Sequence, residues 1–183
     1  MAGATGRGYG SRFSSIAGFR FVKLFGVAGW SGSGKTTLLV RLIPELVGRG
    51  LKVSTIKHAH HAFDVDVPGK DSFRHREAGA TEVMIGSTNR WALMHELRGE
   101  AELTLDEMIA RLSPVDLVIV EGFKRNPHPK LEVWRASVGK PMLQPEDPTI
   151  RAVVSDGSAQ GLPVPVLSIE DVAGVADFIL KEI

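Results

Sequence analysis

Apolar residues are arranged along this chain in a repeating order of strand-like and helix-like segments. Residues Phe21 to Ala28 are apolar and β-prone, which predicts a strand. After residue 37, leucine, isoleucine and valine recur over positions 38–47 at the spacing of a single helical face. The residues between these segments are rich in glycine and serine. The pattern therefore predicts a strand, a tight loop and a helix, in that order.

The alternation continues to the C-terminus. The run from Asp116 to Gly122 has an unbroken apolar centre, which is typical of a strand buried between two layers of helices. Residues Gly86 to Asn89 separate two short strand-like segments and predict an antiparallel hairpin. Strands alternating with helices predict an α/β protein, a three-layer sandwich with a mostly parallel sheet and a β-hairpin extension. Further strands are expected at 51–58, 82–85, 90–96, 130–135, 151–156 and 164–169.

Capping patterns mark the ends of several helices. Thr104–Glu107 and Ser168–Asp171 are capping boxes, so each is expected to begin a helix. Asp71 or Ser72 is expected to cap a short helix that Gly79 ends.

The composition limits the classes of partner. The chain has 183 residues, 43% of them hydrophobic, a net charge of +1 and no cysteine. Its length suits one domain, expected at 20–183, and its weak net charge gives no electrostatic reason for a nucleic acid or membrane partner. Residues 1–19 are rich in glycine, serine, alanine and arginine, so a disordered tail is expected there. The lack of cysteine and of a long apolar run favours a cytoplasmic protein.

The segment from Gly29 to Thr37 carries the strongest chemical signal in the chain. It matches G-x-x-x-x-G-K-[ST], the pattern of loops that bind nucleotide phosphates. Small residues let successive backbone N–H groups point at phosphate oxygens, and the following helix N-terminus favours an anion. The predicted architecture is therefore that of a P-loop NTPase, with a chance glycine-rich turn as the alternative. The residues expected to bind phosphates are Gly29, Trp30, Ser31, Gly32, Ser33, Gly34, Lys35, Thr36 and Thr37.

Four residues have specific expected roles around that loop. Lys35 is a candidate catalytic residue because its ammonium can reach the β- and γ-phosphates, and Thr36 is a candidate Mg²⁺ ligand. Glu121 ends the most apolar strand, and ligands bind beyond the carboxyl ends of parallel strands, so it is expected to bind Mg²⁺ as well. Asp66 follows the second strand and is expected to contact Mg²⁺ and act in catalysis, in a segment that responds to the γ-phosphate. Solvated surface acids are the alternative for both carboxylates.

Histidines and arginines in the middle of the chain have open roles. His58, His60 and His61 suggest a metal site, but no thiolate or further ligand cluster accompanies them. Contacts with phosphate or with a partner protein fit these histidines better. Arg74 and Arg76 suit either an anionic substrate or a solvated helix face.

Asp156 is the candidate residue for recognising the base of a bound nucleotide. It ends a late strand, and a carboxylate can accept two hydrogen bonds from N1 and N2 of guanine, a donor pair that adenine lacks. The N-K-x-D pattern is absent, and Asp156 followed by Gly157 also suits a simple turn. The choice of base therefore stays open on the residues alone.

Several segments together resemble one family. The resemblance is to the MobB family, the molybdopterin-guanine dinucleotide biosynthesis adaptor proteins, and it covers about residues 21–183. The middle segments are more specific than the phosphate loop, which many families share. The similar segments are Gly29–Thr37, Lys57-His58, Phe63–Asp66, Pro68–Ser72, Arg74–Arg76 and Glu121–Lys124.

This resemblance implies a GTP-binding protein of molybdenum cofactor biosynthesis that uses Mg²⁺, has weak GTPase activity and forms a homodimer. It implies that the protein assists the guanylyltransferase MobA, which attaches GMP to molybdopterin, either by delivering nucleotide or by handing cofactor to molybdenum apo-enzymes. The family's relation to dimeric metallochaperone GTPases places a dimer contact at the hairpin around residues 90–96. The implied site comprises Gly29 to Thr37 for the phosphates, Thr36 and Glu121 for Mg²⁺, Asp156 for guanine, and Lys124 in the same site.

Two other classes of function remain as alternatives. A P-loop kinase would use ATP to phosphorylate a small metabolite, but such a kinase usually needs an arginine-rich lid, and Arg74 and Arg76 are the only clustered arginines. A pure binding module would hold the nucleotide as a structural element. No glutamine is evidently placed to orient an attacking water, so slow turnover is expected.

Overall fold

The computed structural model describes residues 22–59, 63–157 and 159–183. The expected N-terminal tail, residues 1–19, lies outside the described residues. The chain forms two compact units, one built from the residues up to His58 together with Ile109–Ile183, and the other from Ala59–Met108. Each unit has its own sheet.

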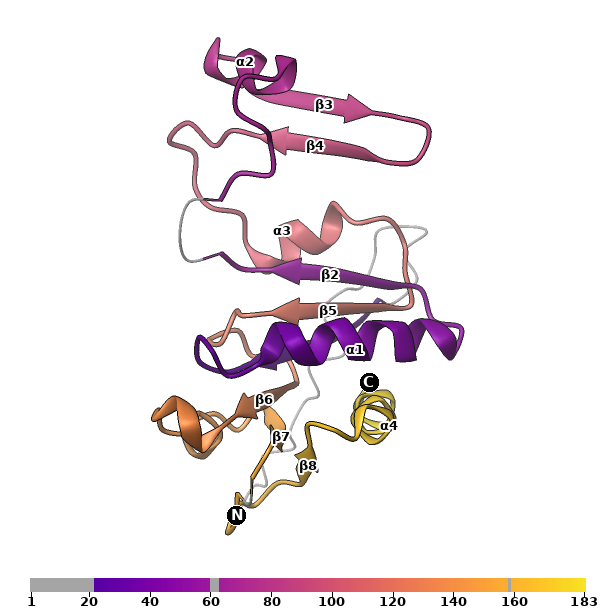
Figure 1. The fold of residues 1–183 in the computed structure, drawn as a ribbon, viewed down its shortest axis with the longest axis vertical. Coiled ribbons are helices and arrows are strands. Elements are labelled where there is room, and N and C mark those ends of the chain that lie inside the picture. Colours follow the sequence, from indigo (N-terminus) through magenta and orange to yellow (C-terminus); the bar gives the residue numbers. More distant parts are fainter. Residues whose placement is uncertain (1–21, 60–62, 158) are drawn as a thin grey trace, which may run out of the picture. The chain divides into compact units, whose positions relative to one another are not determined.

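A six-stranded sheet forms the centre of the larger unit (Figure 1). All of its pairings are parallel. β5 is fully buried from Leu117 to Val120, because a parallel sheet is covered on both faces. The prediction of a mostly parallel α/β sheet is confirmed. The strand order is β2 (Val53–Lys57), β5 (Leu117–Glu121), β1 (Lys23–Ala28), β6 (Lys130–Trp134), β7 (Ile150–Ser155) and β8 (Val166–Ser168).

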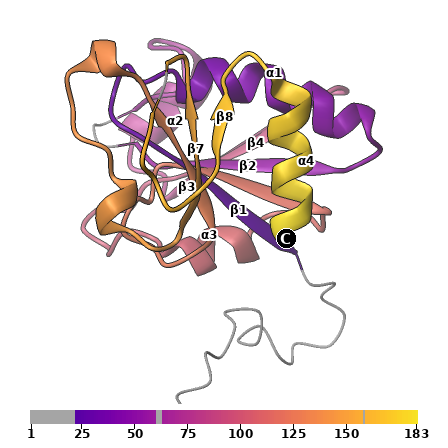
Figure 2. The same ribbon diagram turned by 90° about the horizontal axis from the view of Figure 1, so that it is seen from below.

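Two helices, α1 (Lys35–Gly48) and α4 (Val172–Glu182), pack against one face of this sheet and contact each other (Figure 2). Alternate strand residues such as Phe25 and Val27 face the leucines of α1, as the two-residue period of a strand requires. α1 continues through Pro44 and has the expected helical stripe of buried leucines. None of the helices in the described ranges has the length and apolar character that a bilayer crossing requires.

The opposite face of β6 carries charged side chains that are buried. Lys130 and Glu132 are 1% and 0% exposed, so each needs a polar partner. Glu132 accepts hydrogen bonds from backbone N–H groups of the connection between β6 and β7, and Lys130 pairs with Asp147 at 3.2 Å in the same connection. This connection contains the short turns η2 (Ala136–Val138) and η3 (Gln144–Glu146), where an extended loop was expected. The connection, not a helix, therefore covers this part of the sheet.

A histidine is packed directly against a glycine of the central strand. His128 is 3% exposed, and a methyl group added at Gly26 would lie 2.4 Å from its Nε2 atom. Neither ring nitrogen has a hydrogen-bond partner among the described residues. Burial lowers the pKa of His128 to about 4, and the nearby Lys130 charge acts in the same direction. The imidazole is therefore neutral at physiological pH.

The smaller unit contains a helix and a two-stranded antiparallel sheet. α2 (Asp71–Glu77) precedes β3 (Glu82–Gly86) and β4 (Trp91–His95), which pair with Met84 opposite Leu93. The predicted hairpin is confirmed. The division between the two units falls within a third helix, α3 (Leu105–Ala110).

The two predicted capping boxes have different outcomes. Thr104 and Glu107 form the expected reciprocal pair before α3, with Glu107 Oε2 accepting from the Thr104 N–H at 2.8 Å. Ser168 does not cap α4, because it belongs to β8. Asp171 takes that place instead, and its carboxylate accepts a hydrogen bond from a backbone N–H of the first helical turn at 2.9 Å.

Candidate nucleotide-binding site

The glycine-rich loop follows the carboxyl end of β1 and leads directly into α1. Gly29 has a φ of +141°, and a methyl group there would lie 2.5 Å from the carbonyl oxygen of Val133, so the backbone requires glycine. Gly34 is the N-cap residue of α1, and no side chain caps the helix. The first N–H groups of this 14-residue helix are therefore available to a ligand.

A buried hydroxyl lies within the same loop. Ser33 is 2% exposed, and its Oγ has no hydrogen-bond partner among the described residues. Since a buried polar group without a partner is costly, this hydroxyl fits a ligand that brings oxygen acceptors. The neighbouring Ser31, Gly32 and Thr37 are exposed on the loop and the first turn of α1. The residues present therefore fit a chain of phosphates.

The side chain of Lys35 lies along its own loop. Its Nζ donates hydrogen bonds to the carbonyl oxygens of Gly29 at 3.0 Å and Trp30 at 2.9 Å. Burial lowers the pKa of Lys35, and the Glu121 carboxylate acts in the opposite direction. The ammonium is thus held beside the backbone that would surround an anion.

Thr36 and Glu121 meet at the carboxyl edge of the sheet. The parallel register of β1 and β5 places Val27 beside Glu121, so the carboxylate reaches the start of α1. Thr36 Oγ1 donates to Glu121 Oε1 at 3.1 Å, and Lys57 Nζ lies 3.6 Å from the same oxygen. Hydroxyl and carboxylate oxygens are the ligands that Mg²⁺ prefers. The structure therefore brings together the two residues predicted to hold this ion.

The residues after β5 turn back over the loop. Gly122 and Phe123 both have positive φ, at 97° and 46°. This turn brings Lys124 Nζ to 4.3 Å from the ring centroid of Trp30, a cation–π distance. The indole Nε1 of Trp30 in turn donates to the carbonyl oxygen of Pro141 at 2.8 Å. Lys124 thus lies at the phosphate loop, as expected.

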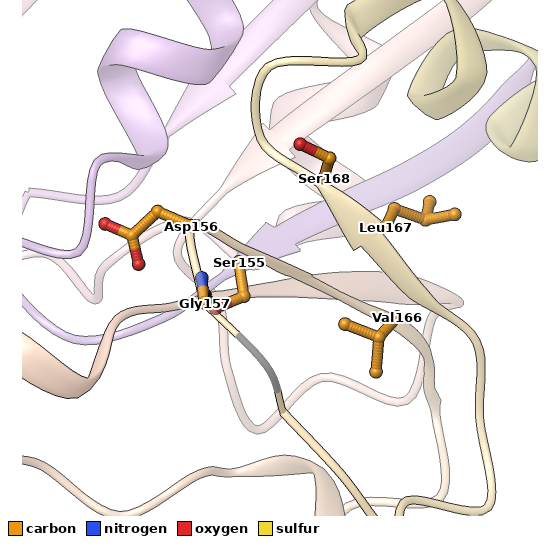
Figure 3. A pocket seen from close by; sticks show the side chains of 6 residues that line it. All are labelled: Ser155, Asp156, Gly157, Val166, Leu167 and Ser168. Atoms are coloured by element: carbon orange, nitrogen blue, oxygen red, sulfur yellow. Dashed lines mark hydrogen bonds between the residues drawn. The ribbon is translucent and has the colours of Figure 1, made fainter.

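Asp156 lies at the same edge of the sheet, just beyond the end of β7. An open hollow of about 380 Å³ is formed there by β7 and β8. Figure 3 shows the carboxylate of Asp156 projecting away from the apolar side chains of Val166 and Leu167. Its two acceptor oxygens suit the edge of a ring that carries two N–H donors. The residues that line the hollow are Ser155, Asp156, Gly157, Val166, Leu167 and Ser168.

Arg135 is a residue of this edge that the sequence did not reveal. It comes directly after β6, and its Nε lies 3.4 Å from Oδ2 of Asp156. A methyl group added at Gly34 would lie 3.1 to 3.4 Å from three guanidinium atoms of Arg135. The signal in the sequence was a basic residue at the carboxyl end of a strand, which gains meaning only when the neighbouring strands are known.

In the smaller unit, Asp66 belongs to a network of charges. Its Oδ1 accepts from Ser72 Oγ at 2.7 Å, and its Oδ2 lies 3.2 Å from Nε of Arg76. Arg76 also pairs with Asp64 at 2.7 Å and with Glu96 at 2.8 Å. The Ser72 hydrogen bond is the largest cause that lowers the pKa of Asp66. The catalytic and Mg²⁺ roles expected of Asp66 stay predictions, and its described contacts engage both carboxylate oxygens within this unit.

The same network explains why α2 begins differently from the prediction. Neither Asp71 nor Ser72 caps the helix, since Lys70 occupies the N-cap position without a side-chain hydrogen bond. The Ser72 hydroxyl is directed to Asp66 instead. Of the two arginines, Arg74 is exposed and Arg76 is half-buried among acids.

The histidine hypothesis is only partly covered by the described residues. His60 and His61 lie outside them, and the ring of His58 lies 4.7 Å from that of Phe123. Within residues 22–59, 63–157 and 159–183, no group of three or more histidines and acids is arranged to hold a metal ion.

The parallel sheet, the glycine-rich loop and the helix that follows it define a P-loop α/β protein of the nucleotide-binding class. The family model "Molybdopterin guanine dinucleotide synthesis protein B" (MobB) matches residues 24–156. The chain belongs to this family.

Curated relatives and solved structures agree with this assignment. The "Molybdopterin-guanine dinucleotide biosynthesis adapter protein" of Escherichia coli strain K12 is 44% identical over 169 residues, covering 91% of this chain and 96% of the relative. That of Haemophilus influenzae is 42% identical over 159 residues, covering 86% and 88%. A crystal structure of molybdopterin-guanine biosynthesis protein B has a TM-score of 0.69 at 31% identity, covering 87% of this chain and 99% of that one. A MobB homologue from Bacillus stearothermophilus has a TM-score of 0.61 at 26% identity, covering 87% and 96%.

Proposed function

We propose that this protein is a GTP-binding adapter of molybdopterin-guanine dinucleotide biosynthesis, with slow, Mg²⁺-dependent GTPase activity. The observation that carries the proposal is the 3.1 Å contact of Thr36 with Glu121 beside the uncapped N-terminus of α1. In this proposal Gly29 to Thr37 bind the phosphates, Lys35 offsets their charge, and Thr36 and Glu121 hold Mg²⁺. The ion would neutralise charge on the β- and γ-phosphates. The relatives' names support the pathway and the adapter role.

Guanine is the proposed base. The hollow is formed by residues at β7 and β8. In the sheet, only β6 separates β7 from β1, the strand that leads into the phosphate loop. Asp156 at the rim of the hollow offers two acceptor oxygens on one carboxylate, which match the N1 and N2 donors of guanine. Adenine presents only its exocyclic amino group as a donor and would leave part of this carboxylate unpaired.

Slow turnover is proposed because the sequence has no glutamine in the phosphate loop or in the segments that follow β2 and β5, where a residue could orient an attacking water. The chain has two glutamines, Gln144 and Gln160. Gln144 is 5% exposed within the β6–β7 connection, and Gln160 follows β7. Hydrolysis by the protein alone should therefore be slow, and phosphate release should rise when the MobA guanylyltransferase is added. Fast hydrolysis by the isolated protein would count against the adapter role.

The proposed partners are MobA, molybdenum apo-enzymes and a second copy of this chain. The second copy is proposed to dock at the β3–β4 hairpin. Its two strands carry an exposed apolar face formed by Met84, Trp91 and Leu93, with exposures of 66%, 67% and 45%. The Trp91→Glu variant should sediment as a monomer at concentrations where the wild type sediments as a dimer. A monomeric wild type would refute the homodimer.

The test of nucleotide binding uses Trp30, which lies within the loop. A variant with Trp91→Phe and Trp134→Phe leaves Trp30 as the single tryptophan, because the chain has three. Its fluorescence should change on adding GTP with Mg²⁺ and change much less with ATP. Lys35 donates to the Trp30 carbonyl oxygen and Lys124 lies over the indole ring, and bound phosphates would attract both ammonium groups. An equal or larger response to ATP would favour the kinase alternative over the adapter.

Lys35→Ala in the same background is the critical variant. It should lose the response, with nucleotide affinity lower by about 100-fold, because one buried charge interaction with phosphate is removed. Lys23→Ala, an exposed lysine at the start of β1, is the matched control and should bind normally. Tight binding of GTP by Lys35→Ala would contradict the proposal.

A further inference from the structure

Arg135 lies between the phosphate loop and Asp156, the residue proposed to bind the guanine base. A methyl group added at Gly34 would be 3.1 Å from its Nη2, 3.3 Å from Cζ and 3.4 Å from Nε, so the flat guanidinium rests on the backbone of the loop. The same Nε atom is 3.4 Å from Oδ2 of Asp156. The same side chain therefore contacts both ends of the proposed nucleotide site.

The fold places Arg135 there without help from neighbouring residues in the sequence. β6 lies between β1, which leads into the loop, and β7, which leads into Asp156. The register pairs Trp134 with Ser155, so the next residue of each strand, Arg135 and Asp156, emerge side by side at the carboxyl edge. The arginine is fixed by the sheet, not by a mobile loop.

The arginine is incompletely satisfied as a hydrogen-bond donor. Its Nε is buried and has no hydrogen-bond partner among the described residues, although the Asp156 carboxylate is close. Asp156 is 44% exposed at the side chain, against 30% for Arg135, so the carboxylate is held by charge on one side and open on the other. This is the arrangement needed to orient a carboxylate toward a ligand.

We propose that Arg135 is a positioning residue that orients the Asp156 carboxylate for the N1 and N2 donors of guanine. The inference rests on the proposed GTP function. It predicts that guanine selectivity depends on a residue outside any guanine motif of the sequence. A merely structural arginine would support affinity for all nucleotides equally.

The experiment measures dissociation constants for GTP, ITP and inorganic triphosphate with Mg²⁺. Inosine keeps N1–H but lacks the 2-amino group, so the ratio of GTP to ITP affinity reports the second hydrogen bond to Asp156. One charge-assisted hydrogen bond predicts a ratio of about tenfold or more in the wild type. Arg135→Gln should bring this ratio close to one, while the affinity for inorganic triphosphate changes by less than about threefold.

Further variants make the result specific. Arg135→Lys keeps the charge but not the planar fork, so it should retain only part of the ratio. Arg151→Gln removes an exposed arginine of β7 and should leave the ratio at the wild-type value. In an Asp156→Ala background, Arg135→Gln should change the ratio no further, because there is no carboxylate left to orient. Equal unfolding midpoints would show that the variants fold.

The outcomes separate this inference from the function on which it rests. A wild-type preference for GTP that survives intact in Arg135→Gln would overturn the positioning role and leave the GTP function standing. Equal losses for GTP, ITP and triphosphate would overturn it too, because Arg135 would then only support the loop. A wild type that does not distinguish GTP from ITP would refute the guanine contact itself. Should Arg135→Gln fail to fold, Arg135→Lys with an unchanged ratio gives the same refutation.

Discussion

The phosphate loop and the acidic network of the smaller unit are both marked by charged residues, but they use charge differently. At the loop, Ser33 Oγ is buried and has no hydrogen-bond partner in the described part of the chain, and no described side chain caps α1. In the network, Arg76 is paired with three acids, and Asp66 has a partner for each carboxylate oxygen. The phosphate loop therefore has hydrogen-bonding groups without partners among the described residues, whereas the charged groups of the network are paired with one another.

This difference distinguishes charged residues that bind a ligand from charged residues that stabilise the fold. Unused donors beside a helix N-terminus indicate that a ligand completes the site. A closed set of ion pairs indicates that the residues hold a segment in place, because breaking a buried pair leaves an uncompensated charge. We therefore expect changes at the network to lower stability and changes at the loop to lower binding.

The largest expected effect is on stability, from Arg76→Met. The Arg76 side chain is 14% exposed and its partner Asp66 is 4% exposed, so the variant leaves a nearly buried carboxylate without its cation. The free energy of unfolding in urea should therefore fall, and by more than in any of the variants that follow. Arg74→Met on the same helix is the control and should change stability by less than about 0.5 kcal/mol, because Arg74 is exposed. Equal effects from the two variants would contradict the stabilising role of the Arg76 network.

The second effect is a pH dependence that arises in the larger unit. His128 has a folded pKa of about 4, below its unfolded value, so the unfolded chain binds a proton first as the pH falls. Stability should fall between about pH 6.5 and pH 4, by about 2 kcal/mol at pH 5, and recover as the pH rises. His128→Gln should flatten this part of the curve of unfolding free energy against pH.

His95 in the smaller unit supplies a control of opposite sign. Its hydrogen bond to Glu82, and a second one to Glu100, raise its pKa. Its contribution to stability is therefore present at low pH and lost as the pH rises through the raised value. His95→Gln should leave the loss of stability below pH 6.5 in place, and a flat curve in that variant would contradict the assignment to His128.

The third effect concerns binding alone. Glu121→Gln keeps the shape of the side chain but removes the charge beside Thr36 and Lys57. Nucleotide affinity with Mg²⁺ should fall about tenfold, while affinity without Mg²⁺ should stay the same or rise, because a negative charge near the phosphates is lost. Titration of Trp30 fluorescence with and without Mg²⁺ measures this difference. An equal loss under both conditions would argue against an Mg²⁺ ligand at this position.

The smallest effect is expected from Ser72→Ala. The hydroxyl donates to Asp66 at 2.7 Å, and its removal leaves Arg76 as a partner, so stability should fall by less than in Arg76→Met. The pKa of Asp66, followed by NMR, should rise because the largest cause of its depression is gone. A stability loss as large as that of Arg76→Met would show that the network depends on the hydroxyl more than on the charge.

Features that are encoded in one contiguous segment were predictable. The spacing of Gly29 to Thr37, the strand before it and the leucine stripe after it predicted the loop between β1 and α1. The apolar run ending at Glu121 predicted the place of this carboxylate at the carboxyl end of a buried strand. Arg135 was not predictable in this way, because its contact with Asp156 depends on the parallel register of β6 and β7. The prediction that Ser168 caps the last helix was wrong for a related reason. Ser168 pairs with Ser155 in the sheet, so the strand takes the residue that a local pattern assigned to a helix cap.

The packing of His128 on Gly26 has a consequence for the history of this family. A methyl group at Gly26 would lie 2.4 Å from the imidazole and also 2.7 Å from Cβ of Lys130, so two side chains of the neighbouring chain segment already fill the space. A smaller residue at position 128 would remove only one of these two clashes. Among relatives that keep this packing, position 26 should therefore remain glycine even where position 128 differs.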